Sequence, residues 1–224
     1  ALAAELLALP ASPDVLFVDD ASPDGTGAVL DRVALGTDRI RVIHRAGRLG
    51  IGGAHQAAIG WAYDRGYRHL VTMDADHTHP PSQVARLLEA AVDLDLVVGS
   101  RYVQTGSMPG WSGLRRAQTV VAHGLTTSLL GLEHDATSSF RCYRLDRIPR
   151  ARFDGIRSQG YSFFLESLCL LRWQGVRVGD VPVFLPPRRA GSSKMTLVDA
   201  AVSARTLLRL TAERLARRRA QPPG

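Results

Sequence analysis

HLVTMDAD (69–76) is the stretch that decides the fold, because it is an apolar run that ends in two carboxylates. DVLFVDD (14–20) and DLVVGSRY (95–102) have the same form, and RIRVIHR (39–45) and VRVGDVPVFL (176–185) are further strand candidates. Helical patterns separate most of these runs. The sequence therefore predicts βαβ units and an α/β fold with a mainly parallel sheet flanked by helices.

The remaining segments complete this plan. Helices are predicted at 1–9, 29–34, 80–92, 114–131, 160–175 and 197–219. A further helix is predicted to follow a glycine-rich turn and to end near residue 64. TSSFRCYR (137–144) is predicted as a strand packed on the sheet. We expect one catalytic domain at 1–195 and a C-terminal amphipathic basic helix at 196–224, with apolar positions near 197, 201, 204, 208, 212 and 215.

Composition excludes several classes of protein. The 224 residues are 45% hydrophobic, which argues against a disordered chain, and no apolar run reaches the roughly 18–20 residues of a spanning helix. Cys142 and Cys169 are too few for a disulfide framework, and no signal peptide opens the chain, so a cytoplasmic location is expected. The net charge is +7, but Lys194 is the only lysine, so genome bias explains the arginines better than a nucleic-acid partner does.

Three predicted strands end in polar clusters. Asp19 and Asp20 close the first, Asp74 and Asp76 the third, and Arg101 follows the fourth. Ligands bind beyond the carboxyl ends of strands in an open parallel sheet, so these clusters predict a site for a metal and an anionic ligand. A single cluster is better explained as a strand-end cap or turn, whereas three clusters on one edge favour a functional site.

Asp74 and Asp76 are the sharper signal. Residues i and i+2 of an extended segment point the same way, so the two carboxylates can share a hard cation such as Mg²⁺ or Mn²⁺. His77 and His79 flank the pair. Capping or surface roles are favoured for these histidines over metal ligation.

Glycines and arginines form further candidates for phosphate binding. Gly53 belongs to a glycine-rich turn, 47–54, whose backbone N–H groups can approach a phosphate, although a plain tight turn fits equally. Arg115 and Thr119 share one helix face and, with Arg101, are candidates to hold a phosphate; a solvated helix face is the alternative.

A late loop, 186–195, carries Arg188, Arg189 and Lys194 among prolines and glycines. This composition suits either a cationic flap over phosphates or a merely exposed loop.

Seven motifs occur in order along nearly the whole chain. They are VDDASPDGT (18–26), RAGRLGIGGA (45–54), MDADHTHPP (73–81), GSRY (99–102), DATSSFR (135–141), GYSFFLE (160–166) and RRAGSSKM (188–195), with Trp111 followed by Arg115. Together they resemble the polyprenyl-phosphate mannosyltransferases, which include the dolichol-phosphate mannose synthases, of inverting glycosyltransferase family 2. The resemblance implies a GT-A fold, a GDP-mannose donor, a polyprenyl-phosphate acceptor and Mg²⁺ or Mn²⁺.

The resemblance also implies roles for individual residues. Asp74 and Asp76 match the family's acids that bind the metal and the donor diphosphate. Asp19 and Asp20 match the acids that contact the nucleoside, and Gly53 is likewise assigned to nucleotide-sugar binding. The other matches are Arg101, Arg115 and Thr119 for the acceptor phosphate, Arg188 and Lys194 for a flap that closes on phosphates, and Asp135 and Glu166 for family positions of less defined role.

The chain also departs from the resembled pattern. The given sequence begins after the strand that usually opens the family, which leaves a truncated sequence, a misplaced gene start or a lost part of the donor site open. Thr78 stands where a third metal contact is often supplied, and Ser139 stands where glycine is usual. These departures keep a non-catalytic GT-A subunit open as an alternative, and a UDP-sugar-dependent transferase is another. The given sequence carries no C-terminal membrane segment, so we expect it to resemble the catalytic-only type.

The implied mechanism is a single displacement with inversion. The acceptor phosphate, with a second pKa of about 6, is largely dianionic and needs no strong base. Asp74 and Asp76 would hold a divalent metal that neutralises the leaving diphosphate, while Arg101, Arg115, Arg188 and Lys194 would neutralise and orient the acceptor. The C-terminal helix, with Arg214 and Arg217–Arg219, is expected to rest on the cytoplasmic face of an anionic membrane.

Overall fold

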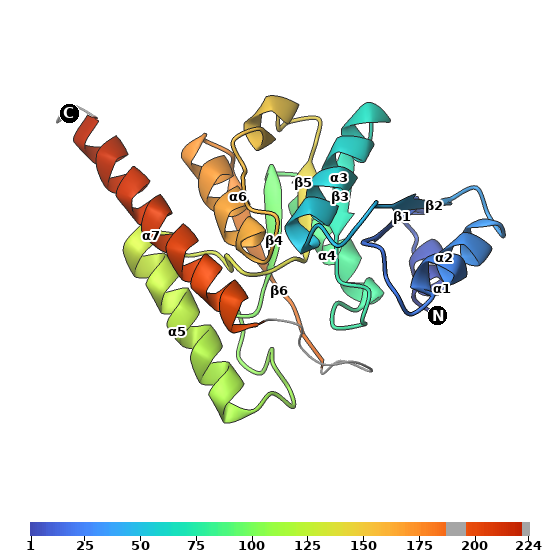
Figure 1. Ribbon diagram of the computed structural model, residues 1–224, viewed down its shortest axis with the longest axis horizontal. Helices are drawn as coiled ribbons and strands as arrows, with labels where there is room; N and C mark the ends of the chain where they lie inside the picture. Colours follow the sequence, from blue (N-terminus) through green and yellow to red (C-terminus); the bar gives the residue numbers. More distant parts are fainter. Residues whose placement is uncertain (187–195, 221–224) are drawn as a thin grey trace.

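The computed structural model describes residues 1–186 and 196–220, and the strands among them form two sheets (Figure 1). The strands are β1 (Val15–Asp19), β2 (Ile40–His44), β3 (His69–Thr72), β4 (Leu96–Ser100), β5 (Arg141–Arg144) and β6 (Val178–Pro182). The helices are α1 (Leu2–Leu7), α2 (Thr26–Ala34), α3 (Ile51–Asp64), α4 (Val84–Ala90), α5 (Gly113–Leu130), α6 (Ser162–Trp173) and α7 (Leu197–Ala220), with 3₁₀ turns η1 (Pro81–Gln83) and η2 (Arg150–Phe153).

The larger sheet has the order β3-β5-β4-β6. β4 and β6 are parallel, and β5 is antiparallel to both of its neighbours, so β3, β4 and β6 share one direction. The expected α/β fold with a mainly parallel sheet is confirmed. The segment predicted to pack on the sheet is instead β5 in its interior, where Cys142 and Tyr143 are fully buried.

The smaller sheet consists of β1 and β2, which pair in parallel. Among the residues described here, β1 pairs only with β2 and β3 only with β5, so no main-chain ladder joins the two sheets. Helix α3 contacts both β1 and β3 and so links them. Tyr67, in the turn between α3 and β3, adds a hydrogen bond of 2.5 Å from its hydroxyl to Asp14, just before β1.

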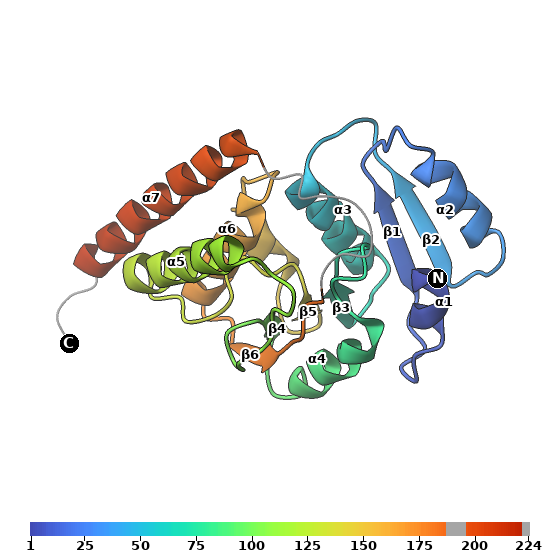
Figure 2. The same cartoon turned by 90° about the horizontal axis from the view of Figure 1, so that it is seen from below.

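Helices cover both faces of the larger sheet (Figure 2). On one face lies α6, in which every residue from Ser162 to Leu171 is buried. On the other lies α4, whose Val84 and Leu87 pack with Val97. Alternate residues of β4 enter the two cores, because successive side chains of a strand point to opposite faces.

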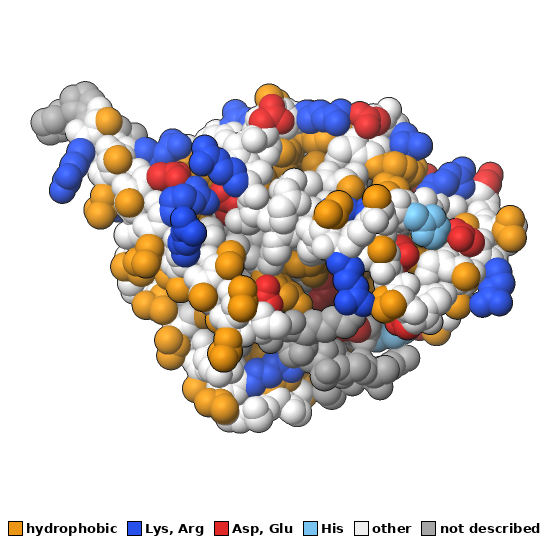
Figure 3. Space-filling model, in the orientation of Figure 1, with side chains coloured by type: hydrophobic (Ala, Val, Ile, Leu, Met, Phe, Trp, Pro, Cys, Tyr) orange, Lys and Arg blue, Asp and Glu red, His pale blue; other side chains and the backbone are white. Residues whose placement is uncertain are grey.

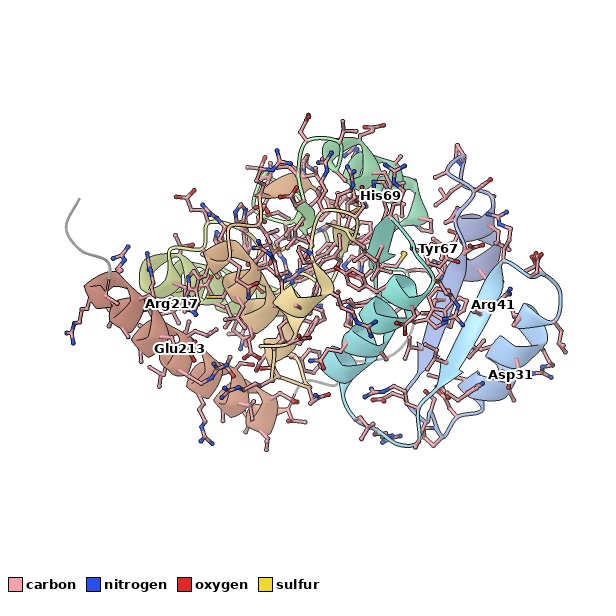
Figure 4. All side chains as sticks on the ribbon, turned by 90° about the horizontal axis from the view of Figure 1, so that it is seen from above. Asp31, Arg41, Tyr67, His69, Glu213 and Arg217 are labelled. Carbon is pink, nitrogen blue, oxygen red and sulfur yellow. The ribbon has the colours of Figure 1, made fainter. Side chains whose placement is uncertain are left out.

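Helix α7 packs on α6 and α5 and shares the main core through Leu210. Arg209 of α7 forms an ion pair of 2.5 Å with the buried Glu166 of α6, and Arg214 donates to the Leu129 carbonyl at 2.8 Å. Figure 4 shows Glu213 and Arg217 of α7 at the opposite end of the molecule from Asp31 and Arg41.

The apolar positions predicted for α7 do not all face the core. Leu197, Leu208 and Leu215 are at least half exposed, whereas Thr206 and Leu210 are buried. Periodicity identified an amphipathic helix, but the face that packs is the more polar one.

Two glycines offer a matched test of this packing. A Cβ at Gly52 in α3 would lie 2.5 Å from the Phe163 Cβ and 2.8 Å from the Gln159 backbone, whereas one at Gly124 in α5 would meet nothing within 4 Å. Gly52→Ala should lower the free energy of unfolding by about 1–3 kcal/mol through overpacking. Gly124→Ala should raise it by about 0.5–1 kcal/mol through helix propensity. Urea unfolding measures both, and equal effects would contradict the contact of α3 with 159–163.

Candidate active site

The polar clusters that follow β3 and β4 meet around the buried side chain of His79. Its Nδ1 accepts the Asp74 N–H at 3.0 Å, and its ring stacks on Phe140 with centroids 4.9 Å apart. Burial lowers the pKa of His79, the Asp74 and Asp76 carboxylates oppose this shift, and Arg101 adds to it. All three residues therefore lie within electrostatic range of one imidazole, and the acidic and basic clusters share one region.

A turn, not an extended strand, places the two carboxylates. β3 ends at Thr72, and His77 has a positive φ of 61°. Asp76 Oδ1 accepts from the Thr78 N–H at 3.0 Å and from its hydroxyl at 2.5 Å. Asp74 therefore stands beyond the end of β3, and Asp76 lies in a bend that begins at Ala75; that the two carboxylates point the same way stays a prediction.

The acid pair fits a hard divalent cation by its chemistry. Carboxylate oxygens are the ligands that Mg²⁺ prefers, and one or two of them suffice when substrate phosphates and waters complete the shell. Within residues 1–186 and 196–220, no cluster of three or more His, Cys, Asp or Glu side chains could hold a metal ion. His79 Nδ1 is already used by the Asp74 backbone. Asp74 and Asp76 are therefore the candidates, and the cation would depend on ligand oxygens.

A buried ion pair dominates the basic cluster. Arg101 Nε lies 2.7 Å from Asp135 Oδ2, and Nη2 donates to Asp135 Oδ1 at 3.2 Å and to the Thr137 hydroxyl at 3.1 Å. The two charged side chains are only 11% and 1% exposed. Burial acts to lower the pKa of Arg101, but Asp135 raises it, and the net direction is upward. Asp135 thus occupies the Nε–Nη2 edge of Arg101, the edge that could otherwise bind a phosphate through two hydrogen bonds.

Trp111 lies between two guanidinium groups. The Cζ of Arg115 is 3.7 Å from the centroid of the indole, and the Cζ of Arg101 is 5.8 Å from it. Ser112 begins α5 and caps it by accepting the Arg115 N–H at 3.3 Å. Trp111 received no role from the sequence, although a tryptophan shortly before an arginine pair was a usable signal for a cation–π contact.

Thr119 helps to dock α5 through its backbone. Its carbonyl accepts the Tyr102 hydroxyl at 3.1 Å, and the Tyr102 ring stacks on His123 with centroids 3.9 Å apart. Arg116 and Arg101, with residues 104–108, line a small pocket of about 200 Å³. Arg116 is a site candidate that the sequence reasoning missed, because it considered only the face shared by Arg115 and Thr119.

The predicted nucleotide-binding residues are engaged in local structure. Asp20 forms an ion pair of 2.6 Å with Arg45 and accepts the Leu49 and Gly50 N–H groups at 3.2 and 2.9 Å. Gly53 donates its N–H to the Gln159 carbonyl at 3.0 Å. Asp20 therefore holds the glycine-rich turn in place, and the N–H of Gly53 supports packing instead of facing a phosphate.

Asp19 ends β1 and is largely buried. Hydrogen bonds from Ser22 lower the pKa of its carboxyl despite burial, and His44 lies 3.6 Å away. The carboxyl is thus charged at neutral pH, as a contact to a ligand hydroxyl requires.

Two further predictions have different outcomes. Glu166 accepts the Arg157 and Ser158 N–H groups at 3.1 and 2.7 Å and pairs with Arg209, so it fixes a turn and α7. Arg188 and Lys194 lie outside the described residues.

Arg141 is a supporting residue that the sequence reasoning missed. It is fully buried, and it donates to the Ser138 and Phe164 carbonyls at 2.8 Å and to the Ser167 hydroxyl at 2.9 Å. These bonds hold the 135–139 loop. A charged residue inside the apolar strand pattern of 137–144 was the available signal.

His55 of α3 is a partly exposed residue whose imidazole lies within electrostatic range of Asp74. Desolvation lowers its pKa to about 4, so its imidazole is neutral at pH 7. Its ring lies edge-on to Phe164, with centroids 4.9 Å apart. His55 therefore adds no charge beneath the site.

A comparison of sequences finds clear relatives. A model of the family described as glycosyl transferase family 2 matches residues 5–149. An undecaprenyl-phosphate mannosyltransferase of Micrococcus luteus is 42% identical over 190 residues, which cover 84% of this chain and 78% of the relative. A polyprenol monophosphomannose synthase of Mycolicibacterium smegmatis is 39% identical over 189 residues, which cover 81% and 70%.

Solved structures agree in fold. A glucosyl-3-phosphoglycerate synthase from Mycobacterium tuberculosis, in complex with Mn²⁺, UDP-glucose and glycerol 3-phosphate, superposes with a TM-score of 0.58 at 18% identity and covers 89% of this chain and 68% of its own. The same enzyme with Mg²⁺ and UDP gives 0.58 at 19% identity, covering 88% and 66%. At this level of identity the likeness concerns the fold alone.

The Arg101–Asp135 pair makes a testable contribution to stability. Asp135→Asn should lower the free energy of unfolding by about 3–5 kcal/mol, because it leaves a buried guanidinium without its counter-charge. The control is Asp64→Asn, which breaks an exposed pair with Arg150 and should cost about 0–1 kcal/mol. Urea unfolding at pH 7 compares the two, and similar losses would contradict the buried state of the pair.

Proposed function

The chain belongs to glycosyl transferase family 2 and has the expected GT-A fold, and on this premise we propose that it transfers mannose from GDP-mannose to a polyprenyl phosphate. The observation that supports the proposal is that one loop, 135–139, contacts both Asp74 of the acid pair and Arg101, one of the two guanidinium groups at Trp111. The names of both relatives at about 40% identity support mannose and a polyprenyl phosphate.

The chemistry explains why both clusters are needed. A phosphate monoester must approach the anomeric carbon of a sugar whose leaving group is a diphosphate. Both reactants are anions, so the site must lower their mutual repulsion. The acceptor is largely dianionic above its second pKa of about 6, so a strong general base is unnecessary.

Asp74 and Asp76 are the residues that would hold a divalent cation. A bound Mg²⁺ or Mn²⁺ neutralises the charge that develops on a diphosphate leaving group. The Mycobacterium tuberculosis enzyme of the same fold was crystallised with each of these ions, which supports a divalent metal in general. Asp19, at the end of β1, would meet the nucleoside, while Asp20 and Gly53 would shape its pocket through the glycine-rich turn.

Arg101 and Arg115 would bind and orient the acceptor phosphate. Asp135 occupies the Nε–Nη2 edge of Arg101, and Nη1 makes no hydrogen bond within the described residues. Arg115 is exposed, and its guanidinium lies over the Trp111 ring, with Cζ 3.7 Å from the ring centroid. Such guanidinium groups would align the phosphate for in-line attack, and a single displacement inverts the anomeric centre. Arg188 and Lys194 are proposed to close on the phosphates.

Exposed apolar side chains gather on α5 and α7, which contact each other, and Figure 3 shows them on one side of the molecule. Nine of the sixteen exposed large hydrophobic residues in the described part of the chain lie on these two helices. They are Leu114, Val120, Val121 and Leu125 of α5, and Leu197, Val198, Val202, Leu208 and Leu215 of α7. We call this set the α5–α7 surface. An apolar surface of this kind suits a lipid interface beside a polyprenyl acceptor.

The basic end of α7 has a mixed role in this proposal. Arg214 and Arg217 make contacts within the protein, to the Leu129 carbonyl and to the Trp173 ring. Arg218 and Arg219 are exposed and would face anionic headgroups at the cytoplasmic side of the membrane. None of the described helices is both long and apolar enough to cross a bilayer.

The transfer reaction is tested directly with Asp76→Ala. Its rate from radiolabelled GDP-mannose to polyprenyl phosphate should fall roughly 100-fold or more, because a ligand of the neutralising cation is lost. Asp64→Asn serves as the control and should keep the wild-type rate. A parallel assay with UDP-glucose tests the donor. Wild-type transfer from UDP-glucose but not from GDP-mannose would overturn the donor, and an unaffected Asp76→Ala variant would overturn the metal role.

The α5–α7 surface is tested by flotation on phosphatidylglycerol vesicles. Replacing Val120, Val121 and Leu125 with serine should weaken binding by about tenfold or more, because exposed apolar area then no longer enters the interface. Val29, Val33 and Leu35 on and after α2 are also exposed, so their replacement with serine is the matched control and should leave binding unchanged. Equal flotation of both triple variants would remove the proposed membrane surface.

A further inference from the structure

Ser139 connects the end of β3 to a carboxylate of the acid pair. Its hydroxyl donates to Asp74 Oδ1 at 2.8 Å, and its carbonyl accepts the Thr72 hydroxyl at 2.8 Å. Ser139 is buried, with 6% of its surface exposed. Hydrogen bonds thus fix both the carbonyl of Ser139, to Thr72 at the end of β3, and its hydroxyl, to the side chain of Asp74.

We propose that Ser139 is a positioning residue that sets the orientation of the Asp74 carboxylate for a divalent cation. The inference rests on the proposed function, in which Asp74 and Asp76 hold that cation. Oδ1 of Asp74 is used by the Ser139 hydroxyl, whereas Oδ2 accepts no hydrogen bond in the described part of the chain. The hydrogen bond therefore divides the carboxylate into one anchored oxygen and one oxygen available to a ligand.

This division matters because a ligating carboxylate that rotates freely loses conformational freedom when the ion binds. A fixed partner removes part of that cost beforehand, and partners of this kind typically change metal affinity by about 10–100-fold when they are removed. Because Ser139 is buried and held at both ends, its hydroxyl restricts the rotation of the Asp74 carboxylate.

The 135–139 loop carries the other half of the site as well. Asp135 and Thr137 hold Arg101, and Arg141 fixes the loop through the Ser138 carbonyl. Ser139 thus fixes Asp74 relative to the Arg101 guanidinium, because the 135–139 loop contacts both side chains. A general weakening of the loop would disturb both halves, whereas loss of the Ser139 hydroxyl alone affects the acidic half.

Ser138 provides a matched control within the same loop. It is as buried as Ser139, and its hydroxyl donates to the Gly99 carbonyl at 2.7 Å without contacting either aspartate. Ser138→Ala and Ser139→Ala each remove one buried hydroxyl oxygen. The Ser138 hydroxyl also accepts the Phe140 N–H at 3.3 Å, so Ser138→Ala removes at least as much hydrogen bonding from the loop while leaving the Asp74 contact in place.

The experiment is a titration of Mn²⁺ into the full chain with saturating GDP at pH 7, followed by electron paramagnetic resonance of free Mn²⁺. Ser139→Ala should weaken Mn²⁺ binding about tenfold, while Ser138→Ala should stay within twofold of wild type. Ser139→Thr, which keeps the hydroxyl, should recover most of the affinity. Thermal unfolding of both alanine variants shows that they are folded.

The outcomes separate this inference from the proposed function. Asp74→Asn is titrated in the same way and should lose Mn²⁺ binding. If Asp74→Asn binds Mn²⁺ like wild type, the metal role of Asp74 fails, and the role of Ser139 fails with it. If Asp74→Asn loses binding but Ser139→Ala keeps it, only the role of Ser139 is overturned. Equal weakening in Ser138→Ala and Ser139→Ala also overturns it, because the effect would then belong to the loop.

Discussion

The buried ion pair between Arg101 and Asp135 is the interaction on which the arrangement of the site depends. It ties the end of β4 to the 135–139 loop, and the same loop reaches Asp74 through Ser139. Arg141, which is fully buried, joins this loop to α6 by donating hydrogen bonds to the carbonyls of Ser138 and Phe164. A short stretch of chain thus fixes one acidic and one basic group relative to each other. Charges held in this way need little reorganisation when anionic ligands arrive.

The positions of the strands followed from the sequence because each is a short apolar run with polar ends. Burial on both faces makes such runs nearly continuous in hydrophobicity, as in β4, where all five residues are buried. The same reasoning predicted that the polar strand ends form one site, and the 135–139 loop contacts the residues that follow β3 and β4. It did not anticipate that 141–144 would enter the interior of the sheet, because an apolar run carries no information about its neighbours.

Side-chain roles were harder to predict than positions. Asp20 and Gly53 were assigned to a ligand by local pattern, but Arg45 and Gln159, distant in sequence, engage them. Arg141 was given no role because partners such as Ser167 come from another element. The apolar stripe of α7 was visible as a pattern, yet the pattern does not reveal which face packs. In each case the missing information is a long-range contact.

The lack of strand pairing between the β1–β2 sheet and the larger sheet, among the described residues, also affects how the protein unfolds locally. The buried core of the β1–β2 unit contains only Leu6, Val15 and Ile40, and no ladder connects it to the larger sheet in the described residues. Two paired strands alone are marginal in water. Amide protons of β1 and β2 should therefore exchange with solvent through a partial unfolding that leaves β3–β6 intact. A nucleotide that contacts both the β1–β2 sheet and the larger sheet would slow this exchange, because its binding energy would stabilise the contact between them.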